Sequence, residues 1–476
     1  MKKITGLLIL IFAVSMFSAC SKIEKSNVDY SIGDPLETSN TIQSESPPPD
    51  PTVTTSDTSS SSNTDTSKTT TNSNTSNSNT SNSTTQKPTT TTKQGTTTKP
   101  GTTTGGTTVT TPPTSPSRYN PINYSVQKGV WITYIENIIV SSGKTEAQYR
   151  STISSAYSKI KATGCNTVYV QVRSHADAYY DSSYFAKSYR SSSSFDQLEV
   201  MVEEAHKLGI SIHAWINPMR GPTASAMASM SDTSVMKKWY NDPSKNGKYI
   251  VNYGGNYYFN PAYSEVRQLI SNGIAEIVSK YNVDGIHIDD YFYPSGAASS
   301  FDSSAYSQYG SGMSLADWRR SNTDKMVSSM YSTIKNINSK IPFGISPQGN
   351  NSNNYNSLYA NVSKWCSTSG YLDYVVPQIY WSFNHPTAGF KNKCAEWRGI
   401  VKNYNIKLVI GLATYKVGTN EYDFNTDPYI MSKEINYAKT ISGYGGVAFY
   451  RYDHICGGSI PSGVQQDMNN IKQALK

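Results

Sequence analysis

The sequence is short of cysteine, and none of its cysteines lies close to another. Only five occur in 476 residues. Setting Cys20 aside, the remaining four are scattered along the chain as Cys165, Cys366, Cys394 and Cys456. Zinc sites take ligands in closely spaced pairs, so we expect no metal centre. Export would permit one disulfide, and isolated buried thiols are the alternative.

Basic clusters and phosphate-binding loops are also missing. The net charge of +8 is modest, and Lys and Arg form no stripe, so nucleic acid is not an expected partner. No Gly-rich loop follows the first apolar segment of the globular part, which argues against a dinucleotide-binding fold. We therefore expect no cofactor. The mild positive balance is compatible with an anionic cell wall.

The only long hydrophobic run lies at the start of the chain. Lys2 and Lys3 precede "GLLILIFAVSMF", which is too short to span a bilayer, and "FSAC" follows. The cysteine resembles that of a bacterial lipobox, so residues 1–20 are expected to be a lipoprotein signal peptide with Cys20 as the lipid-bearing residue. An ordinary signal peptide is the alternative. Several acyl chains would hold the protein on the outer face of the cytoplasmic membrane.

Apolar residues are almost absent between Asp34 and Arg118, where Thr, Ser, Asn, Pro and Gly dominate. Such a segment cannot bury enough apolar surface to offset its chain entropy. We assign residues 21–122 to a disordered linker, with an average span of roughly 50 Å for its low-complexity part. It would carry the globular part, residues 123–476, from the membrane into the cell wall.

Apolar segments alternate with helical patterns throughout the globular part. "FDQLEVMVEEAHKLG" predicts a helix that ends before Gly209, and "NPAYSEVRQLISNGIAEIVSKY" predicts one with Asn260 as N-cap and Pro261 at its first position. Alternation of this kind indicates parallel strands with right-handed crossovers. The fold class is therefore α/β, a (β/α)8 TIM barrel; an open doubly wound sheet is the alternative. The predicted strands are "GVWITYI", "NTVYVQVR", "SIHAWINP", "DGIHIDDYF", "PFGISPQG", "YVVPQIYW", "KLVIGLATY" and "GVAFYRYD".

Polar and aromatic residues gather at the C-terminal ends of these strands, where barrels place their active sites. Cations, amides, acids and aromatic rings suit a sugar, which needs stacking surfaces and many hydrogen bonds. The expected substrate-binding residues are Arg173, Asp177, Trp215, Asn217, Arg220, His287, Tyr291, Gln378, Tyr380, Trp381, Tyr415, Lys416 and Arg451, with Gln348 and Tyr452 at equivalent places. His213 and His287 stand in mid-strand, where they face either the site or the core. Asp373, at a strand entrance, is interpreted as structural, and His206 as a surface or capping residue.

The stretch "VDGIHIDDYFYP" places two carboxylates, Asp289 and Asp290, at the end of a buried strand. Burying unpaired charge is costly, so the pair indicates chemistry. Glycoside hydrolysis uses an acid and a second carboxylate that attacks or stabilises the anomeric centre. Two close carboxylates do not ionise independently, which raises one apparent pKa.

Two mechanisms remain open. In one, Asp289 is the nucleophile, and the acid is Asp290 or one of the loop acids Asp177, Asp302 and Glu136. In the other, Asp289 orients the substrate's own 2-acetamido group and Asp290 donates the proton, as in hexosaminidases with adjacent acidic residues. A structural role for Asp290, as a loop cap or a partner of Arg173, is the non-catalytic alternative.

Eight blocks in order, among them "VQVRSHADAYY", "VDGIHIDDYFYP", "FGISPQGN" and "IGLATYKVG", resemble the bacterial glycosyl-hydrolase-like family ten across nearly all of residues 129–452. The resemblance implies a lipid-anchored or secreted barrel glycosidase that cleaves peptidoglycan strands without stem peptides. "HADAYY" and Gln348 depart from the family pattern and leave the sugar preference open. An α-glucan hydrolase, suggested by Asp284, Gly285 and Asp289, and a non-catalytic wall-binding barrel are the alternatives. A monomer is expected.

Limited proteolysis of the full chain tests the domain boundary. Because the segment from Asp34 to Arg118 lacks apolar residues, mild protease should release a stable core that begins between Tyr119 and Val130. Mass spectrometry of the resistant fragment and its thermal unfolding check the expectation. A core that unfolds once the Thr-rich region is removed would contradict it.

Overall fold

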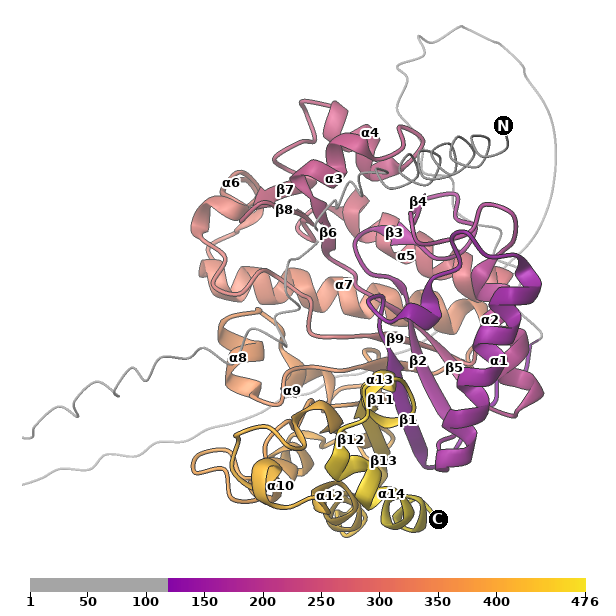
Figure 1. Cartoon of the computed structure of the whole chain (residues 1–476). Helices are drawn as coiled ribbons and strands as arrows, with labels where there is room; N and C mark the ends of the chain where they lie inside the picture. Colours follow the sequence, from indigo (N-terminus) through magenta and orange to yellow (C-terminus); the bar gives the residue numbers. More distant parts are fainter. Residues whose placement is uncertain (1–118) are drawn as a thin grey trace, which may run out of the picture. The chain divides into compact units, whose positions relative to one another are not determined.

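A computed structural model describes residues 119–476, and the expected signal peptide, Cys20 and most of the linker lie outside them (Figure 1). Eight parallel strands close into a barrel in the order β1-β13-β12-β11-β10-β9-β5-β2. This confirms the (β/α)8 barrel over the open sheet, and each predicted strand segment overlaps one barrel strand, although β1 and β13 each start two residues earlier than predicted. The strands are β1 (Gln127–Ile132), β2 (Thr167–Arg173), β5 (Ser211–Ile216), β9 (Gly285–Ile288), β10 (Phe343–Ile345), β11 (Tyr374–Val375), β12 (Lys407–Ala413) and β13 (Tyr444–Tyr450).

The larger helices follow the barrel strands and cover the outside of the barrel. They are α1 (Glu146–Thr163), α2 (Gln197–Lys207), α5 (Ser264–Lys280), α7 (Leu315–Ile337), α10 (Phe390–Ile400), α12 (Ile430–Ala438) and α14 (Ser462–Ala474). No helix among residues 119–476 is both long and apolar enough to cross a bilayer.

One predicted helix end is confirmed and one predicted helix start is wrong. Gly209 follows α2 with φ of +62°, a conformation that favours glycine. The next helix starts at Ser264, not at Pro261. Asn260 Oδ1 accepts a hydrogen bond from the Ala262 N–H at 3.1 Å, which closes a separate turn before the helix. Asn in such a turn gives the same local sequence signal as an N-cap.

Shorter helices and strands lie within the loops. The insertion after β5 holds a three-stranded sheet in the order β6-β8-β7 with two short helices beside it in the upper part of Figure 1. These are β6 (Arg220–Thr223), α3 (Ala224–Ser229), α4 (Val235–Asn241), β7 (Ile250–Tyr253) and β8 (Asn256–Phe259). Elsewhere lie β3 (Asp177–Ala178), β4 (Ala186–Lys187), α6 (Ser303–Tyr309), α8 (Asn351–Asn356), α9 (Val362–Trp365), α11 (Asp423–Thr426) and α13 (Tyr452–Ile455), with 3-10 turns η2 (Asn137–Ile139), η3 (Ser299–Phe301) and η4 (Thr414–Lys416).

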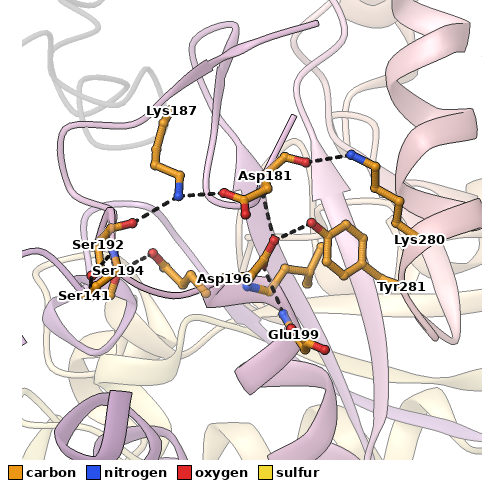
Figure 2. A network of polar contacts seen from close by, with 11 residues as sticks. Ser141, Asp181, Lys187, Ser192, Ser194, Asp196, Glu199, Lys280 and Tyr281 are labelled. Atoms are coloured by element: carbon orange, nitrogen blue, oxygen red, sulfur yellow. Dashed lines mark hydrogen bonds and ion pairs between the residues drawn. The ribbon is translucent and has the colours of Figure 1, made fainter. Parts of the chain in front are cut away.

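The long loop after β2 is fastened through Asp196, as Figure 2 shows. Asp196 Oδ1 accepts the Leu198 N–H at 2.9 Å and so caps α2. Its Oδ2 accepts the Asp181 N–H at 2.9 Å and the Tyr281 hydroxyl. One carboxylate therefore joins the loop to α2 and to the residue that follows α5.

Asp284 organises the N-terminal end of the barrel, which we call the base. This fully buried carboxylate accepts hydrogen bonds from the Tyr119 hydroxyl, the Ile122 N–H and the Ile212 N–H. His206 Nε2 lies 3.0 Å from Asp284 Oδ2, the oxygen that also accepts from Ile212, so His206 is a partner of a buried acid and not a surface or capping residue. Tyr119 and Ile122, within the range assigned to the linker, thus contact the base.

A directional chain of hydrogen bonds fills the barrel interior. Trp131 Nε1 donates to His287 Nε2 at 3.1 Å, and His287 Nδ1 lies 3.1 Å from the Tyr374 hydroxyl. That hydroxyl is 2.7 Å from His213 Nδ1, and His213 Nε2 is 3.2 Å from Ser211 Oγ. Burial lowers the pKa of both histidines, His213 to about 4. Both are therefore neutral, and each ring carries one donor and one acceptor.

Glycine makes room for these rings. A Cβ on Gly344 would lie 1.9 Å from the Tyr374 ring, and one on Gly285 would lie 2.3 Å from the His213 ring. No side chain fits at such distances, so the interior rings require glycine on the neighbouring strands.

Asp373 and the cysteines both have surroundings that the sequence led us to expect. Asp373 Oδ2 accepts the Phe343 N–H and pairs with Lys335, each at 2.7 Å, which confirms its structural role. All four cysteines in the described part of the chain are buried free thiols, so the alternative of isolated thiols applies there.

Replacing Tyr374 with Phe tests the interior chain. The change leaves one donor and one acceptor buried without a partner, and we expect it to lower the free energy of unfolding by about 1–3 kcal/mol. Tyr157→Phe is the matched control, because among residues 119–476 its buried hydroxyl has no hydrogen-bond partner. Equal denaturation midpoints for the two variants would contradict the assigned chain.

Candidate active site

Asp289 and Asp290 follow β9 directly, at the C-terminal end of the barrel. Their side chains are almost buried, with 4% and 9% of the residue surface exposed. The chain turns here because Asp289 Oδ1 accepts the N–H of Tyr291, two residues on, at 3.1 Å. This turn ends the strand and lets both carboxylates occupy the barrel mouth.

Asp289 is bound by donors. Its Oδ2 accepts the indole N–H of Trp215, at the end of β5, at 3.1 Å, and its Oδ1 accepts the Tyr291 N–H. Indole and backbone N–H groups can only donate hydrogen bonds. These two bonds therefore favour the ionised form of Asp289.

Asp290 is bound by two side-chain amides. Gln378 Nε2 donates to Oδ1 at 3.0 Å and also to the Ser346 carbonyl at 3.1 Å. Gln348 Nε2 donates to Oδ2, again at 3.0 Å. An amide carries both a donor and an acceptor, so a rotated glutamine could accept from a protonated Asp290. This environment suits a carboxyl group that changes its protonation state.

Asn217, after β5, adds an amide to the same rim. Its Oδ1 accepts from Gln171 Nε2 at 2.9 Å, while Gln171 Oε1 accepts the Tyr134 N–H at the same distance. Among the described residues, Asn217 Nδ2 is buried without a hydrogen-bond partner. Nδ2 is therefore a hydrogen-bond donor that the fold itself does not use.

Arg220 stands beside the acid pair. Its guanidinium lies 4.4 Å from the centre of the Tyr291 ring and 5.9 Å from that of Tyr134. It opens β6, which pairs with β8 in the insertion. The small sheet thus supports a cation over the ring that follows the catalytic candidates.

Arg173 is not on the rim, contrary to its predicted position. The pairing of β2 with β5 shifts between Gln171 and Arg173, and such a bulge redirects the next side chain. Its guanidinium packs 4.2 Å from the Phe185 ring centre, and a Cβ on Gly273 of α5 would lie 2.4 Å from Nη1. Arg173 thus points to the helix layer. The proposed pairing of Asp290 with Arg173 has no support in this arrangement.

Other predicted ligand residues make contacts within the fold. Asp177 Oδ1 accepts the N–H groups of Ser174 and His175, so it shapes the loop after β2. Lys416 pairs with Glu421 at 2.7 Å. His287 belongs to the interior chain and is completely buried. The structure places it beneath the acid pair, where a ligand does not reach.

The predicted aromatic residues do gather at the mouth. The Tyr380 ring lies 6.1 Å from that of Tyr415 and 5.8 Å from that of Tyr450, at the end of β13. Trp381 is only partly buried. The predicted rings Tyr380, Trp381 and Tyr415 come from the loops after β11 and β12, and Tyr450, which was not predicted, ends β13.

The loop acids separate into different environments. Asp302 forms a fully buried ion pair with Arg319 at 2.6 Å, which makes it structural. Glu136 accepts the Thr133 and Asp453 N–H groups and lies 3.7 Å from Arg451 Nε. Burial raises the pKa of Glu136 to about 8, although its two N–H donors and Arg451 act in the opposite direction.

Sequence reasoning missed some residues that lie around the site. Gln171 and Tyr134 support Asn217 and Arg220, and the polar Gln171 inside the apolar run "VYVQVR" was a usable signal. Within residues 119–476, no group of three or more acids, histidines or cysteines could hold a metal ion.

The sequence matches the family model described as glycosyl hydrolase-like 10 over residues 127–430. The chain belongs to this family. The resemblance inferred from the sequence blocks is thereby confirmed.

Individual relatives fit this membership. Glycosyl hydrolase YngK of Bacillus subtilis (strain 168) is 33% identical over 321 residues, 62% of this chain and 61% of that protein. Glycosyl hydrolase DigH of Escherichia coli (strain K12) is 28% identical over 367 residues, 69% of this chain and 83% of DigH. The chain thus spans about three fifths of the length of YngK.

Among solved structures, the PgaB (BpsB) glycoside hydrolase domain from Bordetella bronchiseptica superposes with a TM-score of 0.50. The match covers 74% of this chain and 99% of that domain, at 10% identity. At this identity the likeness shows a shared barrel fold and nothing finer.

Proposed function

We propose that this protein is a glycoside hydrolase that cleaves peptide-free glycan strands of peptidoglycan at the C-terminal mouth of its barrel. The observation that carries the proposal is the adjacent carboxylate pair, in which Asp289 is bound by obligate donors and Asp290 by amides. Membership of a glycosyl-hydrolase-like family and the aromatic rim support a carbohydrate substrate. The acids also weigh against a purely carbohydrate-binding barrel.

The hydrogen bonds assign different roles to the two acids. Asp289, whose two donors favour its ionised form, is suited to stabilise the positive charge that develops at the anomeric centre. Asp290, whose amide partners accept either protonation state, is suited to protonate the leaving oxygen and later to accept a proton from water. Glu136 is the second candidate for a proton donor because its pKa is raised.

Peptidoglycan sugars carry a 2-acetamido group that can serve as the internal nucleophile. In that version Asp289 orients the acetamido N–H and stabilises its charge, and Asp290 protonates the departing sugar. The donor from Asn217 Nδ2 is free to hold a sugar hydroxyl or the acetamido oxygen. Direct attack by Asp289 on the anomeric carbon is the alternative route and uses the same two residues.

The choice of peptide-free strands rests on Arg220. Without its stem peptide, N-acetylmuramic acid exposes a lactyl carboxylate, which a guanidinium fork can bind with two charge-assisted hydrogen bonds. An attached peptide replaces that carboxylate with a neutral amide and adds bulk. Of the four cations expected on the rim, Arg220 alone stacks on the residue next to Asp290.

We further propose that the enzyme acts outside the cytoplasmic membrane as a monomer. The hydrophobic leader ending at Cys20 and the Thr-rich linker support a lipid-anchored enzyme that reaches into the wall. Mass spectrometry of the mature N-terminus for acylated Cys20 tests the anchor separately from the activity.

Substitution of the two acids separates their roles. Asp289→Asn and Asp290→Asn should each reduce turnover on peptide-free strands by at least about a hundredfold while leaving thermal unfolding near that of the wild type. Activated aryl glycosides, whose leaving group needs no protonation, should restore Asp290→Asn and not Asp289→Asn. If Asp290→Asn keeps its activity and Glu136→Gln loses it, the proton donor is Glu136.

Substrate selection is tested with one glycan in two forms, with and without stem peptides, and with starch as an unrelated glycan. Wild type should prefer the peptide-free form, and Arg220→Ala should reduce that preference about tenfold or more, since a carboxylate loses its charge-assisted partner. Arg320→Ala is the matched control. Arg320 lies on the outer helix α7, and its guanidinium likewise stacks on a tyrosine, 4.0 Å from the Tyr355 ring centre. Equal wild-type cleavage of both forms would refute carboxylate selection, and cleavage of starch instead would refute the substrate.

A further inference from the structure

A row of three rings leads away from the barrel mouth across two rim loops. It begins at Trp381, three residues after Gln378, whose amide binds Asp290. The Trp381 ring centre lies 6.3 Å from that of His385, and the His385 ring lies 4.9 Å from that of Tyr422. The row therefore joins the loop after β11 to the loop after β12.

Exposure increases along this row. Trp381 and His385 are partly exposed, and Tyr422 is half exposed. Trp381 is placed by Gly349, where a Cβ would lie 2.5 Å from its ring and 2.2 Å from the Gln378 carbonyl oxygen. The inner ring thus packs against the backbone near the acid pair, whereas the outer ring faces solvent.

His385 presents a donor between the two flanking rings. Its Nδ1 accepts the Ala388 N–H at 3.0 Å, so the proton of the neutral ring resides on Nε2. Burial and the nearby Lys416 lower the pKa of His385, which keeps it neutral. A neutral N–H between two aromatic rings matches the alternation of C–H faces and hydroxyl groups on a sugar chain.

The rings are not needed to hold the two loops together. Asn384 donates through its backbone N and its Nδ2 to both oxygens of Asp423, each at 2.7 Å. The ion pair of Lys416 with Glu421 fixes the second loop internally. Polar bonds therefore tie the loops, and the ring contacts come in addition.

Tyr422 is also held in a backbone conformation that disfavours a side chain. Its φ is +45°, in the region where glycine is preferred. A large aromatic residue in a strained and exposed position is unexpected if packing were its only role. Strain of this kind is retained where the surrounding structure enforces it, often at ligand sites.

We propose that Trp381, His385 and Tyr422 form a secondary sugar-binding platform that holds the glycan strand beyond the cleaved bond. The proposal rests on the proposed function and deepens it, because it makes strand length a determinant of affinity. The inner ring receives a sugar close to the acid pair, and Tyr422 receives one farther along the strand.

The test uses the full chain and peptide-free glycan strands sorted by length. Tyr422→Ala and His385→Ala should lower the ratio of kcat/KM on long strands to that on the shortest cleaved strand about three- to tenfold, mainly through KM. Tyr422→Phe keeps the ring and should retain the wild-type ratio. The matched control is Tyr404→Ala, because Tyr404 is 89% exposed and precedes β12 at the base.

The outcomes separate the platform from the catalytic proposal. The platform would be overturned if Tyr422→Ala lowered kcat/KM equally on long and short strands. It would also be overturned if Tyr404→Ala lowered the ratio as much as Tyr422→Ala does. If the wild type cleaves no peptide-free strand, the proposed function fails, and binding of length-sorted strands to Asp289→Asn still decides the platform. In that case the platform would be overturned if the affinity did not depend on strand length and did not change when Tyr422→Ala was added.

Discussion

Desolvation of two adjacent carboxylates is the constraint that shapes the mouth of this barrel. Asp289 and Asp290 are nearly buried, and bare charge in such a place would cost several kcal/mol. Trp215 and the Tyr291 N–H compensate one of them, and two glutamine amides compensate the other. The strand ends, the turn after β9 and the rim loops are arranged to deliver these donors. The difference in chemistry between the donors supports the different roles proposed for the two acids.

The side chains beneath the acid pair are uncharged, so no further charge has to be compensated there. The chain from Trp131 through His287, Tyr374 and His213 uses every ring donor and acceptor without introducing charge. A charged histidine there would alter the ionisation of the acids above it. Glycines on neighbouring strands make this filling possible, because any side chain at Gly344 or Gly285 would overlap with a ring.

The sequence was sufficient for the barrel and for the acid pair. Eight apolar segments separated by helical patterns leave few topologies, and a parallel barrel brings all strand ends to one rim. The sequence was not sufficient for Arg173, which ends a strand as expected but whose side chain a bulge in β2 turns to the helix layer. It also could not tell a turn from a cap at Asn260, since the same side chain serves both.

Contacts between loops were beyond the sequence altogether. Gln348 and Gln378 follow adjacent strands, pair through a β-bridge and both bind Asp290, and Asn384 meets Asp423 across two loops. Such pairs depend on three-dimensional closure and leave no local pattern. The row from Trp381 to Tyr422 is of this kind, with residues that are unremarkable singly.

The attachment of the chain at Asp284 has a mechanical meaning. Tyr119 and Ile122 meet this carboxylate at the base, the end of the barrel opposite the acid pair. A pull at Tyr119 would be transmitted to the N-terminal ends of β9 and β5, through bonds to a single buried group. Tension applied there would enter the molecule at the end remote from the mouth, with the length of the barrel between the point of load and the acid pair.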